Sequence, residues 1–267
     1  MKKISVVLVI CLIALMCLSA CGTTDAEDVP EATEAVETQP VETQSAEPEE
    51  NQEVSTPKQL DTAYTVETVG EKDVNENGEV IGDCHYQKVV FTNPNEALAK
   101  INEEIAEECD EFFDEGSGKQ YEEYLKELPD SMKKDLPTYP FVATVDVKDV
   151  YIDDNYVSII QDWDWYAGGV HNYGSTGLNF DLKTGEELDF EDLFASEADA
   201  RTAFENAVNA IIDEQPDAFF EDAKETVKNY DLDDVNFSLN GKVITVYIGQ
   251  YEIAPGASGA FTVIISK

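Results

Sequence analysis

The chain has 267 residues, of which 42% are hydrophobic, so it is long enough to bury a sizeable core. Its 57 acidic residues outnumber its 17 Lys and Arg residues, and the formal net charge is -40. A surface of this charge repels nucleic acids and anionic lipids and attracts cationic partners, although strong acidity also serves solubility alone. The composition therefore argues against nucleic acid as a partner and leaves a cationic ligand open.

The first 20 residues have the composition of a secretory signal, with Lys2 and Lys3 before an apolar run over residues 4–18. The run ends in Leu-Ser-Ala followed by Cys21, which resembles the lipobox of bacterial lipoproteins, where the cysteine is lipidated and becomes the mature N-terminus. The alternatives are an ordinary cleaved signal or an uncleaved anchor, but a spanning helix needs about 20 apolar residues. We therefore expect acylation of Cys21 and attachment to the extracytoplasmic face of the cell membrane.

Residues 21–58 are rich in Glu, Thr, Ala, Pro and Gln and lack aromatic side chains. Such a segment cannot bury enough apolar surface to offset the entropy of ordering. It is predicted to be a disordered acidic linker between the membrane and the folded residues.

The folded part begins with segments typical of strands, at 60–69 and 84–91, followed by a helical pattern. Asn93-Pro94 with Glu96 indicates the start of that helix, and Gly116 indicates its end. A second helix is expected around residues 121–128. Alternating apolar and polar residues then predict strands over 141–152 and 156–166, joined by a turn at 153–155.

The remaining sequence repeats this order of strand, helices and strands. A strand is predicted at 175–182, with a turn at 183–185, and Ser196 with Asp199 indicates a capped helix. Pro216 is expected to open another helix. Strands follow at 235–240, 242–249 and 260–266, the first two joined by Asn240-Gly241. The sequence therefore predicts an α+β fold of two small modules, each an antiparallel sheet packed with helices.

Cys84 and Cys109 are the cysteines that remain after the signal and the lipidation site. In an oxidising compartment they could form a disulfide. Cys109 lies on the apolar face of the predicted helix, however, where a free cysteine acts as a small hydrophobic residue. Both possibilities remain open from the sequence.

The segment 73–78, Asp-Val-Asn-Glu-Asn-Gly, matches the opening of a calcium-binding EF-hand loop. The twelfth position of such a loop should be a glutamate, and here it is Cys84. We therefore interpret Asn77-Gly78 as a hairpin turn and expect no bound metal and no cofactor.

Neither histidine lies in a recognisable catalytic motif. His85 falls within a predicted strand, where a structural role is expected, and His171 follows Gly168-Gly169 in a loop. His171 could act as a general base or could shape the turn through backbone hydrogen bonds. No nucleophile stands at a recognisable spacing, and no hydrolase motif is present, so we expect a protein without enzymatic activity.

Several motifs of the second half resemble one bacterial extracytoplasmic domain family. These are Ala-Gly-Gly-Val-His at 167–171, Asn-Phe-Asp-Leu-Lys-Thr-Gly at 179–185, residues 188–194, and Tyr-Glu-Ile-Ala-Pro at 251–255 with Gly259. The family forms the external, lysozyme-sensing part of RsiV-type anti-sigma factors. It also occurs beside the catalytic domain of PdaC-type peptidoglycan deacetylases.

The resemblance implies a PdaC-like N-terminal α+β module over residues 59–165 and an RsiV C-terminal-like α+β module over 166–267. It departs from the family in three ways, since the sequence shows no sigma-binding domain and no deacetylase domain, and Gly256 replaces the usual aromatic residue after Ala-Pro. The implied function is a non-catalytic module that captures an extracellular ligand, most concretely a cationic lysozyme-like protein. The alternative is a lipoprotein that binds peptidoglycan glycans.

Two loops are predicted to form the ligand-binding surface. Glycines permit close approach of a ligand to the backbone, and proline stiffens a binding loop. The alternative is that these residues only turn the chain. For a glycan, the aromatic residues Trp163, Trp165, Tyr166 and Tyr173 could supply stacking surface or could simply pack in the core. The predicted ligand-binding residues are Gly168, Gly169, His171, Tyr173, Tyr251, Pro255 and Gly256.

Overall fold

The computed structural model describes residues 63–133 and 136–266. The predicted signal peptide, the lipidation site Cys21 and the acidic linker lie outside these residues. Within the described ranges, no helix has the length and apolar character needed to cross a membrane.

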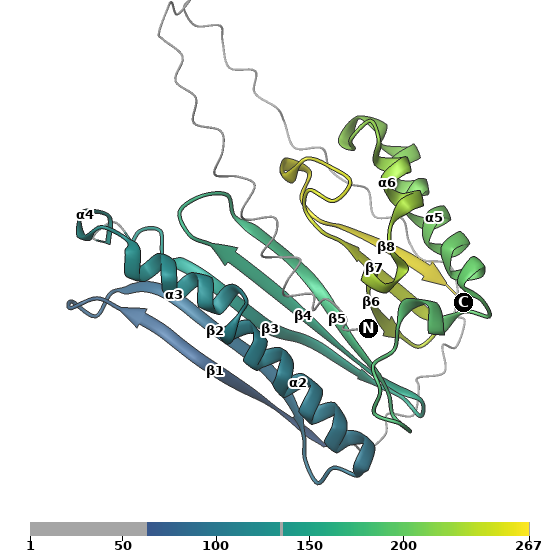
Figure 1. Ribbon diagram of the computed structural model, residues 1–267, viewed down its shortest axis with the longest axis horizontal. Coiled ribbons are helices and arrows are strands. Elements are labelled where there is room, and N and C mark those ends of the chain that lie inside the picture. The colour runs from purple at the N-terminus through teal and green to yellow at the C-terminus, as the bar shows by residue number, and fades with distance from the viewer. Residues whose placement is uncertain (1–62, 134–135, 267) are drawn as a thin grey trace, which may run out of the picture.

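The first module is a five-stranded sheet in the order β1-β2-β3-β4-β5 (Figure 1). Its strands are β1 (Tyr64–Val74), β2 (Val80–Phe91), β3 (Phe141–Ile152), β4 (Tyr156–Tyr166) and β5 (Asn172–Asp181). One face is covered by α2 (Glu96–Asp114) and α3 (Ser117–Glu127), with the short α4 (Asp130–Lys133) after them.

The mixed α+β fold class is confirmed, but the first sheet is not wholly antiparallel. β2 pairs with β3 in parallel, whereas the other neighbouring strands are antiparallel. The helical segment between β2 and β3 is the physical reason, because a parallel pair needs a long crossover connection. β5 continues this sheet although it lies after residue 165, where the predicted modules divide.

The strands β3 and β4 have the predicted bounds, and their alternation gives the sheet two different faces. Trp165 is 7% exposed and packs with Ala143 among the residues under α2 and α3. Asp162 and Asp164 alternate with the tryptophans along β4 and therefore point to the face without helices.

The start of α2 differs from the prediction. The N-cap is Asn95, whose side chain accepts a hydrogen bond from the Leu98 amide, and Asn93 instead has a positive φ of 51°. Proline at 94 therefore precedes the cap and does not occupy the first helical turn. The helix then buries the apolar face expected from its spacing, ending in Cys109 and Phe112.

The second module is a three-stranded antiparallel sheet in the order β6-β7-β8 with helices on one face. It comprises α5 (Glu197–Glu214), α6 (Ala223–Asn229), β6 (Asn236–Asn240), β7 (Val243–Ile248) and β8 (Phe261–Ser266), with the 3-10 turns η2 (Phe190–Leu193), η3 (Pro216–Ala218), η4 (Leu232–Asp234) and η5 (Gly256–Ser258). The predicted cap at Ser196 and the turn at Asn240-Gly241 are confirmed.

The helix expected to begin at Pro216 is interrupted. Pro216 opens a single 3-10 turn, and α6 begins at Ala223. Between them the Phe220 amide donates to the Ile253 carbonyl oxygen at 3.0 Å. This tertiary hydrogen bond draws the chain out of the helical path.

Both cysteines of the first module are buried and free. Burial raises the pKa of the Cys84 thiol to about 12 and also raises that of Cys109. The sequence left open either a disulfide or a buried free cysteine. In the structure both cysteines are free and buried, and they pack as small hydrophobic residues.

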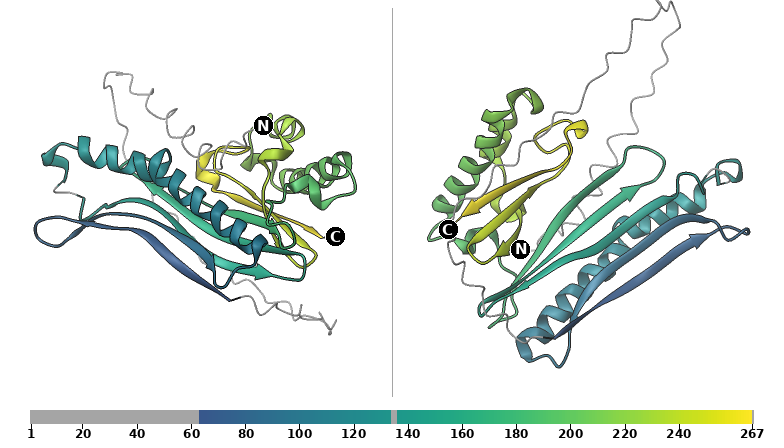
Figure 2. Two further views of the ribbon diagram at one scale, coloured as in Figure 1. Left: turned by 60° about the horizontal axis from the view of Figure 1, so that its bottom comes forward. Right: turned by 180° about the vertical axis from the view of Figure 1, so that it is seen from behind.

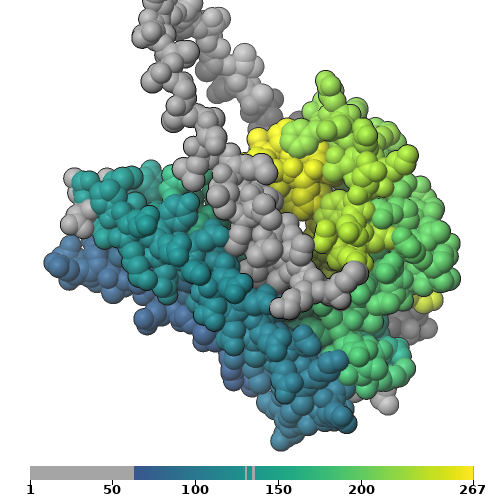
Figure 3. Space-filling model, viewed as in Figure 1, coloured from purple at the N-terminus to yellow at the C-terminus, as the bar shows by residue number. Residues whose placement is uncertain are grey.

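The two modules meet at the edge strand β5 and diverge from there (Figures 1 and 2). In the space-filling view the first module lies at the lower left and the second at the upper right (Figure 3). At this junction β6 packs against β5 and β4. A cavity lies between the two modules beside it.

Candidate functional site

A cavity of about 780 Å³ lies between the two modules. Strands β3, β4 and β5 supply one wall, and the segments around η4, β7 and β8 supply the other. Its acidic lining residues are Asp146, Asp162 and Asp164 on the first sheet, Glu187 and Asp189 on the connecting segment, and Asp231, Asp233, Asp234 and Glu252 on the second module. Among the described residues of the lining, one is basic, Lys148.

Aromatic residues form part of the remaining lining. On the first sheet Tyr173 shares the face of the carboxylates, because it pairs with Asp164, whereas the rings of Trp163 and Trp165 pack on the helix-covered face. On the second module the aromatic residues include Tyr230 and Tyr247. Rings beside carboxylates can hold a cation that carries an apolar body, or can stack on a sugar while carboxylates accept its hydroxyl hydrogens. The cavity thus combines charge and flat apolar surface in one place.

Each carboxylate on the first-sheet wall has a cationic partner. Lys148 Nζ lies 3.0 Å from Asp162 Oδ2, and the Ser175 hydroxyl donates to Asp162 Oδ1 at 2.5 Å. Asp146 pairs with His85, and Asp164 pairs with Nε2 of His171. This wall is therefore partly neutralised by its own side chains.

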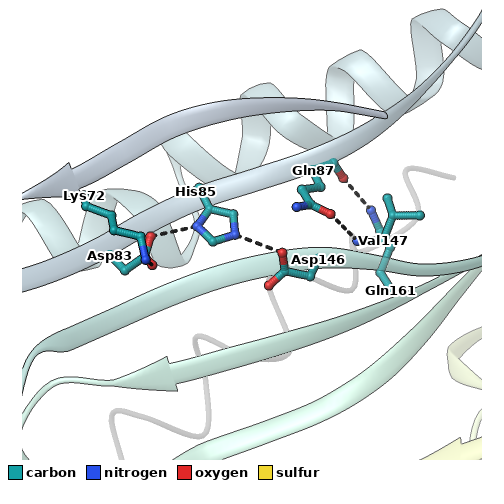
Figure 4. Close-up of polar contacts among 7 residues, drawn as sticks. All are labelled: Lys72, Asp83, His85, Gln87, Asp146, Val147 and Gln161. Atoms are coloured by element: carbon teal, nitrogen blue, oxygen red, sulfur yellow. Dashed lines mark hydrogen bonds and ion pairs between the residues drawn. The ribbon is translucent and has the colours of Figure 1, made fainter. Parts of the chain in front are cut away.

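His85 also ties β2 to β3 at their parallel pairing (Figure 4). Its Nδ1 lies 2.7 Å from Asp83 Oδ1 and its Nε2 lies 3.0 Å from Asp146 Oδ1. Burial lowers the pKa of His85, but the hydrogen bonds to the two carboxylates outweigh it and raise the pKa above its ordinary value. For Asp83 the directions are reversed: burial raises its pKa, but hydrogen bonds from His85 and Lys72 hold the pKa below its ordinary value.

The opposite wall has fewer compensating charges. Glu252 accepts hydrogen bonds from the Gly249 amide at 2.8 Å and from the Tyr230 hydroxyl at 2.9 Å. Burial raises the pKa of Glu252 despite these hydrogen bonds. Burial and the neighbouring Asp231 and Asp233 raise the pKa of Asp234. A cationic ligand would relieve the repulsion on this side.

Side-chain amides hold the two walls together at the β5 edge. Asn236 Oδ1 accepts from the Gly177 amide at 3.0 Å, and its Nδ2 donates to the Ser175 carbonyl oxygen at 2.9 Å. Gln250 Oε1 accepts from the Tyr173 amide at 3.0 Å. These contacts take the place of a further strand at the edge and fix the mouth of the cavity.

The structure brings the two predicted loops together. Gln250, which is 6% exposed, accepts from the Tyr173 amide and donates to the Gly256 carbonyl oxygen at 3.3 Å. The rings of His171 and Tyr173 lie 5.6 Å apart. The ring of Tyr251, a residue with a φ of 69°, packs against Gly256 and leaves no space there for a side chain.

Of the predicted ligand-binding residues, Tyr173 lines the cavity, whereas Gly168, Gly169, His171, Tyr251, Pro255 and Gly256 lie outside its lining. Gly168 has a φ of 82°, a backbone conformation that favours glycine, so the turn alone accounts for a glycine at this position. The binding role of these loops remains a prediction.

Sequence reasoning missed the carboxylates of the first-sheet wall. Their signal is present in the Gln-Asp-Trp-Asp-Trp-Tyr segment at 161–166, where aspartate and tryptophan alternate along an expected strand. Alternation with a period of two places the carboxylates on one face and the rings on the other. The residues of η4 carry no such signal, because acidic residues are common throughout this chain.

In the parts of the chain that the structure describes, no group of three or more His, Cys, Asp or Glu side chains could hold a metal ion. The segment 73–78 forms the β1–β2 turn that the sequence predicted. There the Asn75 side chain accepts from the amides of Asn77 and Glu79, at 2.9 and 3.0 Å.

Two family models match consecutive parts of this two-module α+β chain. One, described as deacetylase PdaC, matches residues 74–173, and the other, described as a protein of unknown function (DUF3298), matches residues 191–267. The PdaC-like part of the resemblance is confirmed. A comparison with curated proteins gives no match.

Two solved structures have similar folds. One is a member of the DUF3298 family from Bacteroides fragilis, 17% identical, with a TM-score of 0.53 over 79% of this chain and 92% of that one. The other is a DUF3298 family protein from Pseudomonas aeruginosa, 14% identical, with a TM-score of 0.44 over 78% and 90% of the two chains. The family matches suggest an accessory module whose ligand is unknown, and the first of these structures shows the fold alone.

Proposed function

We propose that this chain is a lipid-anchored surface protein without enzymatic activity, which captures a cationic extracellular protein in the cavity between its modules. A lysozyme-like enzyme is the concrete ligand, as the resemblance to RsiV-type domains implies. The observation that carries the proposal is the cavity lining, whose described residues include nine carboxylates and one lysine. Basic side chains of a partner would supply the missing charge and could stack on the aromatic rings.

The test is binding of purified residues 59–267 to lysozyme and, separately, to purified peptidoglycan. Capture of lysozyme should weaken as ionic strength rises, because salt screens attraction between opposite charges. Substitution of Asp231, Asp233 and Asp234 by Asn should weaken it about tenfold, since these carboxylates line the cavity.

The matched control replaces Glu104, Glu107 and Glu111 by Gln, which removes the same charge from the exposed face of α2. If both triple variants lose equal affinity, the attraction comes from net charge and the cavity is not the site. Lysozyme that fails to bind at low salt would refute the proposed ligand.

Binding of peptidoglycan is the second candidate function, favoured by the exposed ring of Tyr173 in the lining. Stacking on neutral sugars should hardly respond to salt. Salt-independent binding of peptidoglycan, together with no binding of lysozyme, would establish this alternative.

A further inference from the structure

The chain contains two histidines, and each pairs with a carboxylate that lines the cavity. His85 Nε2 contacts Asp146 at 3.0 Å, and His171 Nε2 contacts Asp164. The strand register places Asp146 opposite Asp162, with Asp164 opposite Thr144, so the three aspartates lie side by side on β3 and β4. The contact of His85 with Asp146 is partly buried, whereas that of His171 with Asp164 is exposed.

The geometry of His85 fits the doubly protonated ring. Both ring nitrogens contact carboxylate oxygens, on Asp83 and Asp146, whereas a neutral imidazole has a single N–H donor (Figure 4). Lys72 Nζ lies 3.0 Å from the other oxygen of Asp83 and stays cationic. Loss of the ring proton would thus leave one of the two carboxylates facing a lone pair.

His171 is more open to solvent, with 52% of its side chain exposed. Beside Asp164 it faces the rings of Tyr166 and Tyr173, and Tyr173 lines the cavity. On the same wall Lys148 forms an ion pair with Asp162. Burial raises the pKa of the nearby Tyr247, which therefore stays neutral there.

We propose that His85 sets the charge of this wall, so that the cavity binds a cationic ligand more tightly as the pH rises. With its ring protonated, His85 supplies the positive charge that Asp146 faces. With its ring neutral, this pair has a net charge of -1. The carboxylates across the cavity, Asp231, Asp233, Asp234 and Glu252, have no histidine among the lining residues to neutralise them.

This inference rests on the proposed function, because it concerns how the same cavity attracts a cation. Its test uses the full chain in a non-ionic detergent and a hexa-arginine peptide, whose guanidinium groups stay charged over the whole range. Affinity is measured by calorimetry at about pH 5.5 and about pH 8.5, on either side of histidine titration, at constant ionic strength. The wild type should bind about three- to tenfold more tightly at the higher pH.

The variant His85→Gln should bind equally at both pH values, as tightly as the wild type does at the higher one. Lys148→Gln is the matched control, since it removes a cation from the same wall and should tighten binding while keeping the pH response. If His85→Gln does not fold, Asp146→Asn should lose the response, because it removes the lining carboxylate that His85 contacts.

Equal affinity of the wild type at both pH values would overturn the inference while leaving the proposed function standing. A full pH response in His85→Gln would overturn it as well. Absence of peptide binding at either pH, together with absence of lysozyme capture, would instead refute the proposed function and the inference with it.

Discussion

At the residue scale, His85 links protonation to the stability of the first sheet. β2 and β3 pair over five residues, from Gly82 with Phe141 to Tyr86 with Val145. Beyond that pairing, Gln87 Oε1 accepts from the Val147 amide and its carbonyl oxygen accepts from Gln161 Nε2 (Figure 4). Because the backbone pairing is short, its stability depends on side-chain contacts between the two strands. The contact of His85 on β2 with Asp146 on β3 is one of them.

The raised pKa of His85 fixes the sign of the pH effect. Its contribution to stability is fully present below the ordinary value of 6.5 and is lost as the pH rises through the higher value in the folded chain. His85→Gln should therefore lower the free energy of unfolding by about 1 to 2 kcal/mol at about pH 6 and by less at about pH 9. Denaturant unfolding at the two pH values measures this.

His171→Gln is the control, because its side chain is exposed and such pairs contribute about 0 to 1 kcal/mol. A loss for His85→Gln that stayed constant or grew with pH would contradict the assigned role.

The lowered pKa of Asp83 acts in the opposite range, where its contribution is lost as the pH falls below 3.8.

At the scale of elements, the junction of β5 with β6 depends on a glycine. A Cβ at Gly177 would overlap the carbonyl oxygen of Phe237, which is backbone and cannot rotate away. Gly177→Ala should therefore push β6 from β5 and lower stability by about 1 to 3 kcal/mol. Thermal unfolding checks this, and lysozyme binding should fall with it because the cavity walls separate.

Gly169→Ala provides the comparison, since nothing lies within 4 Å of a Cβ added there. Its stability should stay within about 0.5 kcal/mol of the wild type. Equal stability of both variants would mean that the close approach at Gly177 relaxes without cost.

Local patterns predicted most of the individual elements but not how they join. β3 and β4 could be predicted to the residue because both alternate strictly and end at turn residues. The end of β1 was missed, since residues 70–74 are charged and exposed, as an edge strand allows. The contacts of Asn236 and Gln250 with β5 join residues about 60 to 80 positions apart and leave no periodic signal.

The candidate site was missed for the same reason. The loops around His171 and Pro255 stand out because glycine and proline mark turns, and the structure does place them together through Gln250. The cavity instead belongs to ordinary strand positions, which become a site only when the second module packs beside them. Residue type alone cannot show which of 57 acidic residues face one another.

At the scale of the whole molecule, anchoring and binding should be separable. Among the described residues, those that line the cavity lie between 117 and 262, whereas the proposed lipid is carried by Cys21. A chain of formal charge -40 is repelled by an anionic membrane surface, so attachment requires acyl chains, and two of them hold where one is marginal. We therefore expect Cys21→Ala to abolish labelling by a radioactive fatty acid and to leave an unprocessed or mislocalised chain. The purified variant should still bind lysozyme with the affinity of the wild type.

A wild-type chain that takes up no fatty acid would refute the lipid anchor. Loss of lysozyme binding in a folded Cys21→Ala chain would show that the N-terminal segment contributes to the site.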